Sequence, residues 1–163
     1  MGSNASYTGP GSTSSQDLFG ENITVPAYEE NGTYFLLNVS ENIFDANRSS
    51  LPNDPVGGIL TLNAKNTTPQ NNSFSVDHIV SNSPIWNAPT AVTVHNNVSF
   101  VYKYYERVFG RNSFDNRGST VLSFINVAEE DGGELDNAFW NVLWKWQRGL
   151  LAFVGCFIRR CRT

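Results

Sequence analysis

The sequence predicts a β-rich α+β fold, a twisted antiparallel sheet meander with one long amphipathic helix. Up to about residue 80, short apolar runs alternate with clusters of Gly, Pro, Asn and Asp, which is typical of strands joined by turns. From residue 89 to residue 110 the apolar residues instead recur every three to four positions, the period of a helix. The chain has 163 residues, 40% of them hydrophobic, so it is long enough to bury one core.

Strands are predicted where an apolar run is bounded by turn residues. These runs are residues 22–28, 32–40, 57–64, 73–80, 120–128 and 137–141. Residues 52–58, PNDPVGG, have the composition of a turn. The first four strands precede the helix and the last two follow it, and no internal repeat is present.

The helix is predicted from an apolar face with steps of four, three, four and three residues. This face consists of Val94, Val98, Val101, Tyr105 and Val108. Polar residues occupy the other side, so His95 is expected at the surface. Pro89 or Thr90 suits the start of the helix, and Gly110 suits its C-terminal cap.

The charge of the chain is divided unevenly. Residues 1–140 contain all fifteen acidic residues and six basic ones, whereas residues 141–163 contain five basic residues and no acid. The acidic part lacks the basic face that nucleic acids require, so no nucleic-acid partner is expected. Both cysteines, Cys156 and Cys161, lie in the basic tail, which rules out a disulfide framework for the acidic part.

Local motifs assign no catalytic and no metal-binding residue. His78 and His95 have no Glu or Cys at the spacing of zinc ligands. The acidic segment EEDGGELD, residues 129–136, is interpreted as a solvated turn because it lacks the fixed spacing of a calcium loop; a calcium site is the alternative.

Eight Asn-x-Ser/Thr triplets occur in the chain. They begin at Asn4, Asn22, Asn31, Asn38, Asn47, Asn66, Asn71 and Asn97. In a secreted eukaryotic protein such triplets accept sugars. Because the chain is rich in Asn, chance is expected to supply most of them. The first residues do not form a signal peptide, since no basic and apolar run follows Met1.

One long segment resembles a known family. The residues AVTVHNNVSFVYKYYERVFGRNSFDNRGS, followed about twenty residues later by NAFW, are similar to the thermolysin-like zinc metallopeptidases. In that family a long helix and a Gly-Arg-Asn-Ser-like loop precede an edge strand containing Asn-Ala-Phe-Trp. The upstream runs TGPG, GTYFLLNVS and GGILTLNAKN are similar to the family's opening strands, so the resemblance covers residues 7–141.

The resemblance implies a substrate-binding strand. By that match Asn137 hydrogen-bonds the main chain of an extended peptide substrate, Ala138 offers its backbone carbonyl, and Phe139 and Trp140 shape apolar subsites. An edge strand suits this role, because main-chain hydrogen bonds hold any sequence while side-chain pockets select among sequences.

The resemblance also implies what lies outside this sequence. The family's His-Glu-x-x-His helix and distal Glu, which hold zinc, do not occur in it, so no catalytic and no metal ligand residue is assigned. The expected fold is the N-terminal lobe of a two-lobed, extracellular endopeptidase that cleaves proteins, without its C-terminal lobe. This chain is expected to be inactive, and calcium is a further cofactor in parts of the family.

Residues 142–163 depart from the family pattern and suggest a shifted reading frame. Back-translation of WKWQ, residues 144–147, gives TGG AAR TGG CAR, and dropping the first nucleotide yields Gly, Asn or Ser, Gly. The family has a Gly-Asp-Gly-Asp-Gly segment near this place, although about four fewer residues separate it from Asn-Ala-Phe-Trp in this chain. Frameshifted coding sequence explains why the chain becomes basic and loses its acids.

The alternative takes the tail as native. The segment GLLAFVGCFI followed by RRCR is apolar and then basic, and it is too short to span a bilayer. It then lies at a membrane surface and makes the chain a non-enzymatic binding module. The frameshift hypothesis is preferred, so a membrane partner is not expected.

Overall fold

The computed structural model describes residues 8–68, 74–129, 131–133, 139–143 and 151–155 of the protein. The strands are β1 (Thr8–Gln16), β2 (Asn22–Glu30), β3 (Thr33–Phe35), β4 (Leu37–Asn38), β5 (Ile59–Thr67), β6 (Asp77–His78), β7 (Val80–Ser81), β8 (Ile85–Trp86), β9 (Val121–Val127), β10 (Phe139–Leu143) and β11 (Leu151–Gly155), and helix α1 spans Pro89–Phe109. The predicted β-rich fold with one long helix is confirmed.

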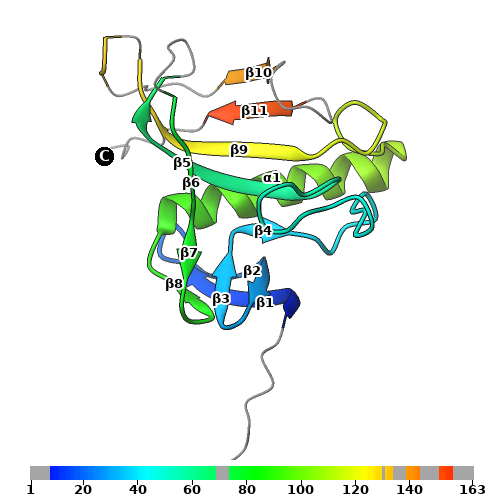
Figure 1. Ribbon diagram of the computed structural model, residues 1–163, viewed down its shortest axis with the longest axis horizontal. Coiled ribbons are helices and arrows are strands. Elements are labelled where there is room, and N and C mark those ends of the chain that lie inside the picture. Colours follow the sequence, from blue (N-terminus) through cyan, green and yellow to red (C-terminus); the bar gives the residue numbers. More distant parts are fainter. Residues whose placement is uncertain (1–7, 69–73, 130, 134–138, 144–150, 156–163) are drawn as a thin grey trace, which may run out of the picture.

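The strands form two sheets; in Figure 1 the first lies below α1, whereas β9, β10 and β11 of the second lie above it. The first has the order β7-β3-β2-β1-β8, and the second has the order β10-β11-β9-β5-β4, with β6 also paired to β5. The prediction of a purely antiparallel meander is wrong, because β1 pairs with β8, β5 with β9, and β9 with β11 in parallel. Parallel neighbours require a crossover connection, and α1 supplies it between β5 and β9.

The apolar pattern did not predict strand β1, because its residues are Gly, Ser, Thr, Pro and Gln; only the family resemblance, through TGPG at residues 8–11, indicated a strand here. It nevertheless pairs with β2 along its whole length, from Thr8 opposite Glu30 to Gln16 opposite Asn22. Its buried hydroxyls are satisfied: Thr13 Oγ1 donates to the backbone oxygen of Val25. Hydrogen bonding therefore compensates for the missing apolar pattern.

The predicted strand at residues 32–40 is divided between the two sheets. β3 belongs to the first sheet and β4 to the second, and Leu36 lies between them. The Leu36 N–H donates to Ile79 O at 3.2 Å, while its carbonyl accepts from Thr61 N at 2.9 Å. The two sheets therefore share one continuous segment of chain.

Helix α1 begins and ends where the sequence predicts. Pro89 occupies the first turn, and Gly110 has the left-handed conformation with φ of 62°. The Gly110 N–H donates to Glu106 O, which closes the helix, and glycine has no Cβ to oppose this conformation.

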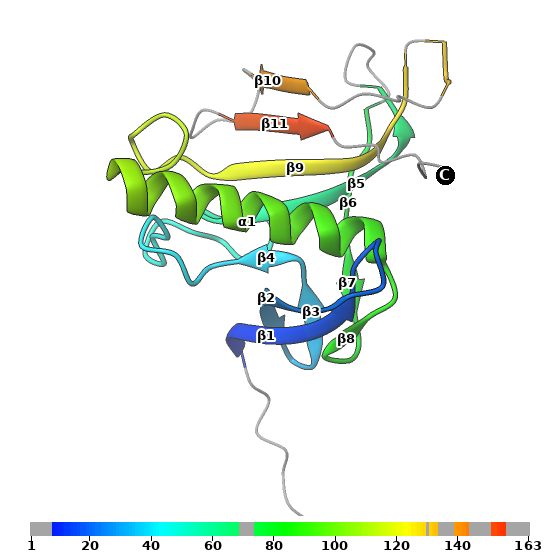
Figure 2. The ribbon, with the colours of Figure 1, turned by 180° about the vertical axis from the view of Figure 1, so that it is seen from behind.

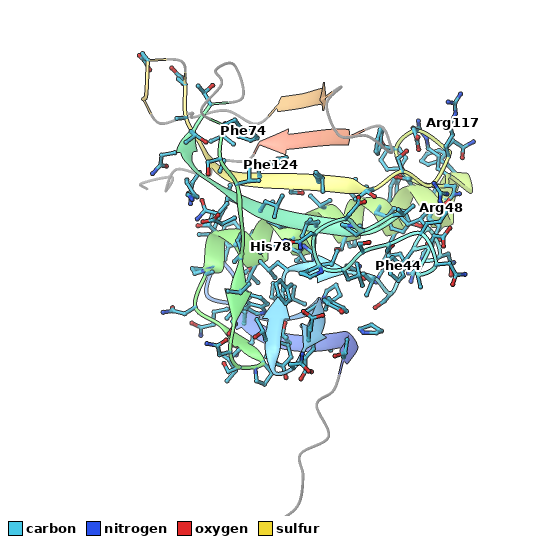
Figure 3. The ribbon with its side chains drawn as sticks, viewed as in Figure 1. Phe44, Arg48, Phe74, His78, Arg117 and Phe124 are labelled. Atoms are coloured by element: carbon cyan, nitrogen blue, oxygen red, sulfur yellow. The ribbon has the colours of Figure 1, made fainter. Side chains whose placement is uncertain are left out.

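The first half of α1 packs against both sheets (Figure 2). One apolar cluster joins the helix to the first sheet and to β9; it consists of Val25, Ala27, Leu36, Trp86, Ala91, Val92, Val94 and Ile125. A second cluster lies around β4, β5 and β9, where Phe74 packs on Phe124 with ring centroids 5.6 Å apart (Figure 3). β5 is buried on both faces as a result, as its apolar run indicates.

The predicted apolar face of the helix is only partly correct. Val94 is buried, but Val101, Tyr105 and Val108 are exposed, with relative accessibilities of 43–55%. The residues that face the sheets along the helix are instead Val94, His95, Ser99 and Tyr102, all buried. In the part of the chain that the structure describes, no helix has the length and apolar composition to cross a membrane.

Candidate functional site

The strand that contains the predicted substrate-binding residues lies at the edge of the second sheet. β10 pairs with β11 in antiparallel register, with Phe139 opposite Gly155 and Trp140 opposite Val154. Among the described strands β11 is the sole neighbour of β10, so one backbone edge of β10 has no strand beside it (Figure 1). An unpaired edge presents N–H and C=O groups to which an extended peptide can bind.

The inner strands of the sheet hold β10 in this position. β11 pairs in parallel with β9, where Ala152 lies opposite Val121, and β9 pairs in parallel with β5. β5 and β9 are the most deeply buried strands. The edge is therefore attached to the core through two intervening strands.

Two of the four predicted site residues lie outside the described residues. These are Asn137 and Ala138, whereas Phe139 and Trp140 begin β10. The predicted last strand at residues 137–141 thus corresponds to a strand at 139–143. The assignment of these residues to substrate binding stays a prediction.

His95 is fully buried, so the expectation that it lies on the surface is wrong. Its Nε2 lies 3.2 Å from the backbone oxygen of Pro26, and its Nδ1 lies 2.8 Å from Oγ1 of Thr61. Because a carbonyl oxygen only accepts, Nε2 carries the proton and Nδ1 accepts from the Thr61 hydroxyl. The imidazole thereby joins the helix to β2 of one sheet and β5 of the other.

This environment keeps His95 neutral. Burial lowers the pKa of His95 from 6.5 to about 4, although the hydrogen bond to Pro26 opposes the shift. A neutral ring whose two nitrogens are both hydrogen-bonded in the core has a structural role. The sequence did not indicate that His95 is buried, because it lies among polar residues of the helix. Its hydrogen-bond partner, Thr61, is 34 residues away in sequence.

His78 lies on β6, on the opposite side of β5 from β9 (Figure 3). Its Nε2 lies 3.0 Å from Oδ1 of Asn53, and its ring meets that of Phe35 edge-on at 5.4 Å. Burial lowers the pKa of His78, and the Asp77 carboxylate acts in the opposite direction. The two histidines belong to different parts of the core and do not form one site.

The acidic turn after β9 is described in part. The Glu129 N–H donates to Gly133 O at 2.9 Å, and the Gly133 N–H donates to Asp131 Oδ1 at 2.8 Å. Over residues 8–68, 74–129 and 131–133, no three His, Cys, Asp or Glu side chains gather as metal ligands. The described residues therefore contain no ligand group of the kind that holds zinc.

A polar network that the sequence did not indicate fixes the helix to the loop after β4. Tyr102 donates to Glu106 Oε1 at 3.1 Å, and Asn42 Nδ2 donates to the same oxygen at 3.2 Å. Lys103 Nζ forms an ion pair with Glu41 at 3.2 Å. Burial and the charge of Glu106 raise the pKa of Tyr102, so its hydroxyl remains a donor at every physiological pH.

The second half of α1 presents apolar side chains to solvent. We call this set the helix stripe; it consists of Phe100, Val101, Tyr104, Tyr105, Val108 and Phe109, each 43–69% exposed. The rings of Tyr104, Tyr105 and Phe109 contact one another, with centroids 5.6–6.0 Å apart. A contiguous exposed apolar patch of this kind is typical of an interaction surface.

Comparison with known proteins gives consistent results. Residues 12–143 match the catalytic domain of the thermolysin metallopeptidases. Neutral protease B of Bacillus subtilis (strain 168) is 37% identical over 91 residues, which cover 52% of this chain and 16% of that protein. Bacillolysin of Bacillus amyloliquefaciens is 27% identical over 137 residues, which cover 83% of this chain and 22% of that protein. The chain thus spans less than a quarter of each relative.

Proposed function

The chain belongs to the thermolysin metallopeptidase family, and from this membership we propose that it forms the first part of the catalytic unit of an extracellular zinc-dependent endopeptidase. The family match runs through the helix and ends within β10. The single observation that supports the proposal best is the position of β10, at a sheet edge with no strand on its outer side among those described.

In this proposal β10 binds the substrate as an added strand. The peptide lies extended along the edge, Asn137 and Ala138 form hydrogen bonds with its main chain, and Phe139 and Trp140 shape apolar subsites. Main-chain pairing tolerates many sequences, which suits an enzyme whose substrates are proteins.

The chemical step belongs to residues outside this sequence. Zinc supplies a Lewis acid and an activated water in this family, but His95 is buried with both nitrogens occupied, and His78 has no partner ligands in the part described. The sequence contains no His-Glu-x-x-His segment. We therefore derive no catalytic step from this chain, and we expect it to hydrolyse no peptide alone.

The helix stripe is proposed to pack against the remainder of the catalytic unit. The matched relatives are more than four times as long as the regions this chain aligns to. Six apolar side chains on one helix face are costly to leave in water, and a second lobe would remove them from it.

For the tail, residues 142–163, we retain the frameshift hypothesis. The membrane-surface alternative needs the apolar segment at residues 149–158 to be available for lipid. Five of these residues form β11, whose backbone pairs with β9 and β10, so this part of the segment belongs to the second sheet.

The decisive experiment is to sequence the gene from the codon of Ala138 to beyond the stop codon. The expected result is a shifted frame that continues into a His-Glu-x-x-His segment. If all three reading frames reach a stop codon without encoding that segment, both the frameshift and the peptidase proposal are contradicted. In parallel, the purified chain should show no chelator-sensitive peptide hydrolysis and no stoichiometric zinc.

The role of the edge is tested in the gene restored to full length. Asn137→Ala should lower kcat/KM by about fivefold, because a substrate hydrogen bond of about 1 kcal/mol is lost. Asn141→Ala, a change of the same type four residues later in the sequence, is the matched control and should leave kcat/KM within about twofold. Equal losses in both variants would refute the assignment of Asn137.

A further inference from the structure

We propose that this protein is N-glycosylated, at Asn22, Asn31, Asn47, Asn66 and Asn97. The proposal shares with the proposed function only the extracellular route and does not depend on peptidase activity. It rests on the number of acceptor triplets and on their placement in the fold.

The triplets are more numerous than the composition explains, so the expectation that chance supplies most of them is wrong. The chain contains eight Asn-x-Ser/Thr triplets, whereas a random order of the same residues gives about three. The last triplet begins at Asn97, so the remaining 40% of the chain, including the candidate substrate edge, has none. The acceptors are thus both enriched and confined to one part of the molecule.

The acceptor asparagines lie where a bulky sugar fits. Five of the six whose positions are described are exposed, on five different elements. Asn22 begins β2, Asn31 lies in the turn between β2 and β3, and Asn66 lies near the end of β5. Asn47 lies in the loop between β4 and β5, and Asn97 is on α1. None of the five points into the core.

Asn38 is the exception and serves as an internal control. It is fully buried, its Nδ2 donates to Glu41 Oε1 at 2.8 Å, and its Oδ1 accepts from Ser40 N at 2.9 Å. Its amide is therefore engaged in the fold, and a sugar on this nitrogen is incompatible with the native structure. The folded protein should contain no glycan at this position.

No hydrogen bond within the described fold explains why position 99, the hydroxyl position of the Asn97 triplet, is a serine. Ser99 is 4% exposed, and its Oγ has no hydrogen-bond partner among the described residues. A buried hydroxyl without a partner costs about 1–3 kcal/mol, so alanine would suit the packing better. An acceptor triplet at Asn97 requires Ser or Thr at this position, although Ser123, outside any triplet, is likewise buried without a partner for its Oγ among the described residues.

Phe19 adds a feature specific to Asn22. It is 78% exposed and lies in the turn between β1 and β2, where Asp17 Oδ1 accepts from the N–H groups of Phe19 and Glu21. Asn22 follows this turn directly. Phe19 is three residues before the acceptor, so a sugar on Asn22 that reached its ring would cover apolar surface now in water.

The reaction requires an oligosaccharide linked to a lipid through a diphosphate as the sugar donor. The amide nitrogen of Asn attacks the anomeric carbon, and a C–N bond forms as the C–O bond to the diphosphate breaks. The nitrogen loses one proton, and the lipid diphosphate is the leaving group. The chain supplies the acceptor and the Ser or Thr hydroxyl, and the transferase is a separate enzyme.

The test measures the mass of the full chain isolated from the cells that produce it, before and after treatment with an amidase that removes N-linked sugars. The expected result is a decrease in mass, with Asp in place of Asn at the five exposed sites and unchanged Asn at position 38. A mass equal to that of the bare polypeptide before treatment would overturn the proposal. So would sugar on Asn38 with none on the five exposed sites.

Two adjacent asparagines provide a matched pair of variants. Asn97→Gln destroys an acceptor triplet and should remove the mass of one glycan, whereas Asn96→Gln, one residue earlier and outside any triplet, should remove none. The measurement is made on denatured protein, so the result does not depend on how well either variant folds. Equal glycan mass in both variants would remove Asn97 from the proposal. A peptidase assay is unaffected by either outcome, which keeps this test separate from that of the proposed function.

Discussion

The two halves of α1 have the same helical backbone but different environments. Residues 89–99 lie against both sheets, and Ala91, Val92 and Val94 are at most 3% exposed. In residues 100–109 Tyr102 is still buried, against Ile59 and Val121, but most of the other large side chains form the exposed helix stripe. The first half is therefore stabilised by this chain alone, whereas the apolar residues of the second half contribute little until another surface covers them.

The largest effect should come from the tryptophan beneath the first half. Trp86 is 5% exposed, packs in the cluster of Val92 and Val94, and donates from Nε1 to Thr13 Oγ1. Trp86→Ala should lower the free energy of unfolding by about 3–5 kcal/mol, measured by urea denaturation. The neighbouring Ile85 is 65% exposed, so Ile85→Ala should cost less than about 1 kcal/mol.

A slightly smaller effect should follow from pH, through His95. The folded pKa is about 4 and the unfolded value is 6.5, so the unfolded state binds the proton more tightly. The contribution of His95 is complete above pH 6.5 and is lost as pH falls from 6.5 to 4. The total loss is about 3 kcal/mol.

The check for His95 is the free energy of unfolding between pH 7 and pH 4 in the native protein and in His95→Gln. Glutamine can donate to Pro26 and accept from Thr61 without titrating. The variant should lack the part of the pH dependence that is due to His95. An identical slope in both proteins would mean that this ring is already protonated or solvated in the folded state.

A matched pair of valines compares the halves most directly. Val94 is 3% exposed and Val101 is 52% exposed on the same helix. Val94→Ala should lower the free energy of unfolding by about 2 kcal/mol, and Val101→Ala should be neutral or slightly stabilising, because alanine has the higher helix propensity. Equal losses would show that something already covers the helix stripe.

The smallest effect should come from the ion pair between Lys103 and Glu41. Lys103 is 42% exposed at its side chain, so Lys103→Met should cost less than about 1 kcal/mol. The loss should shrink further in 1 M salt, because screening weakens the pair in the native protein. A loss that does not depend on salt would instead point to packing of the lysine side chain against the loop.

The sequence predicted the helix well because its signals are local. Pro89 and Gly110 mark the ends through their own backbone preferences, and the apolar period over twenty residues needs no tertiary information. The orientation of the helix was not predictable in the same way. Which residues face inward depends on where the sheets lie and on a partner for His95, and Thr61 is far from it in sequence.

The sheets were predicted less completely than the helix. β1 has no apolar pattern and is identified only by its pairing with β2, and the division of residues 32–40 at Leu36 depends on contacts with Ile79 and Thr61. The candidate edge was predicted from a family resemblance, not from physical patterns. β10 lies at the end of the sheet, and the roles of Asn137, Ala138, Phe139 and Trp140 in substrate binding stay predictions.

The parallel pairing of β5 with β9 has a consequence during synthesis. β5 ends at Thr67 and its central partner ends at Val127, so about 60 further residues must be translated before this edge of β5 is paired. At the usual rates of translation this takes roughly 3 to 12 seconds. For that interval an apolar strand with an open edge is exposed beside the ribosome, so this protein should depend on chaperones that bind extended apolar segments as they emerge.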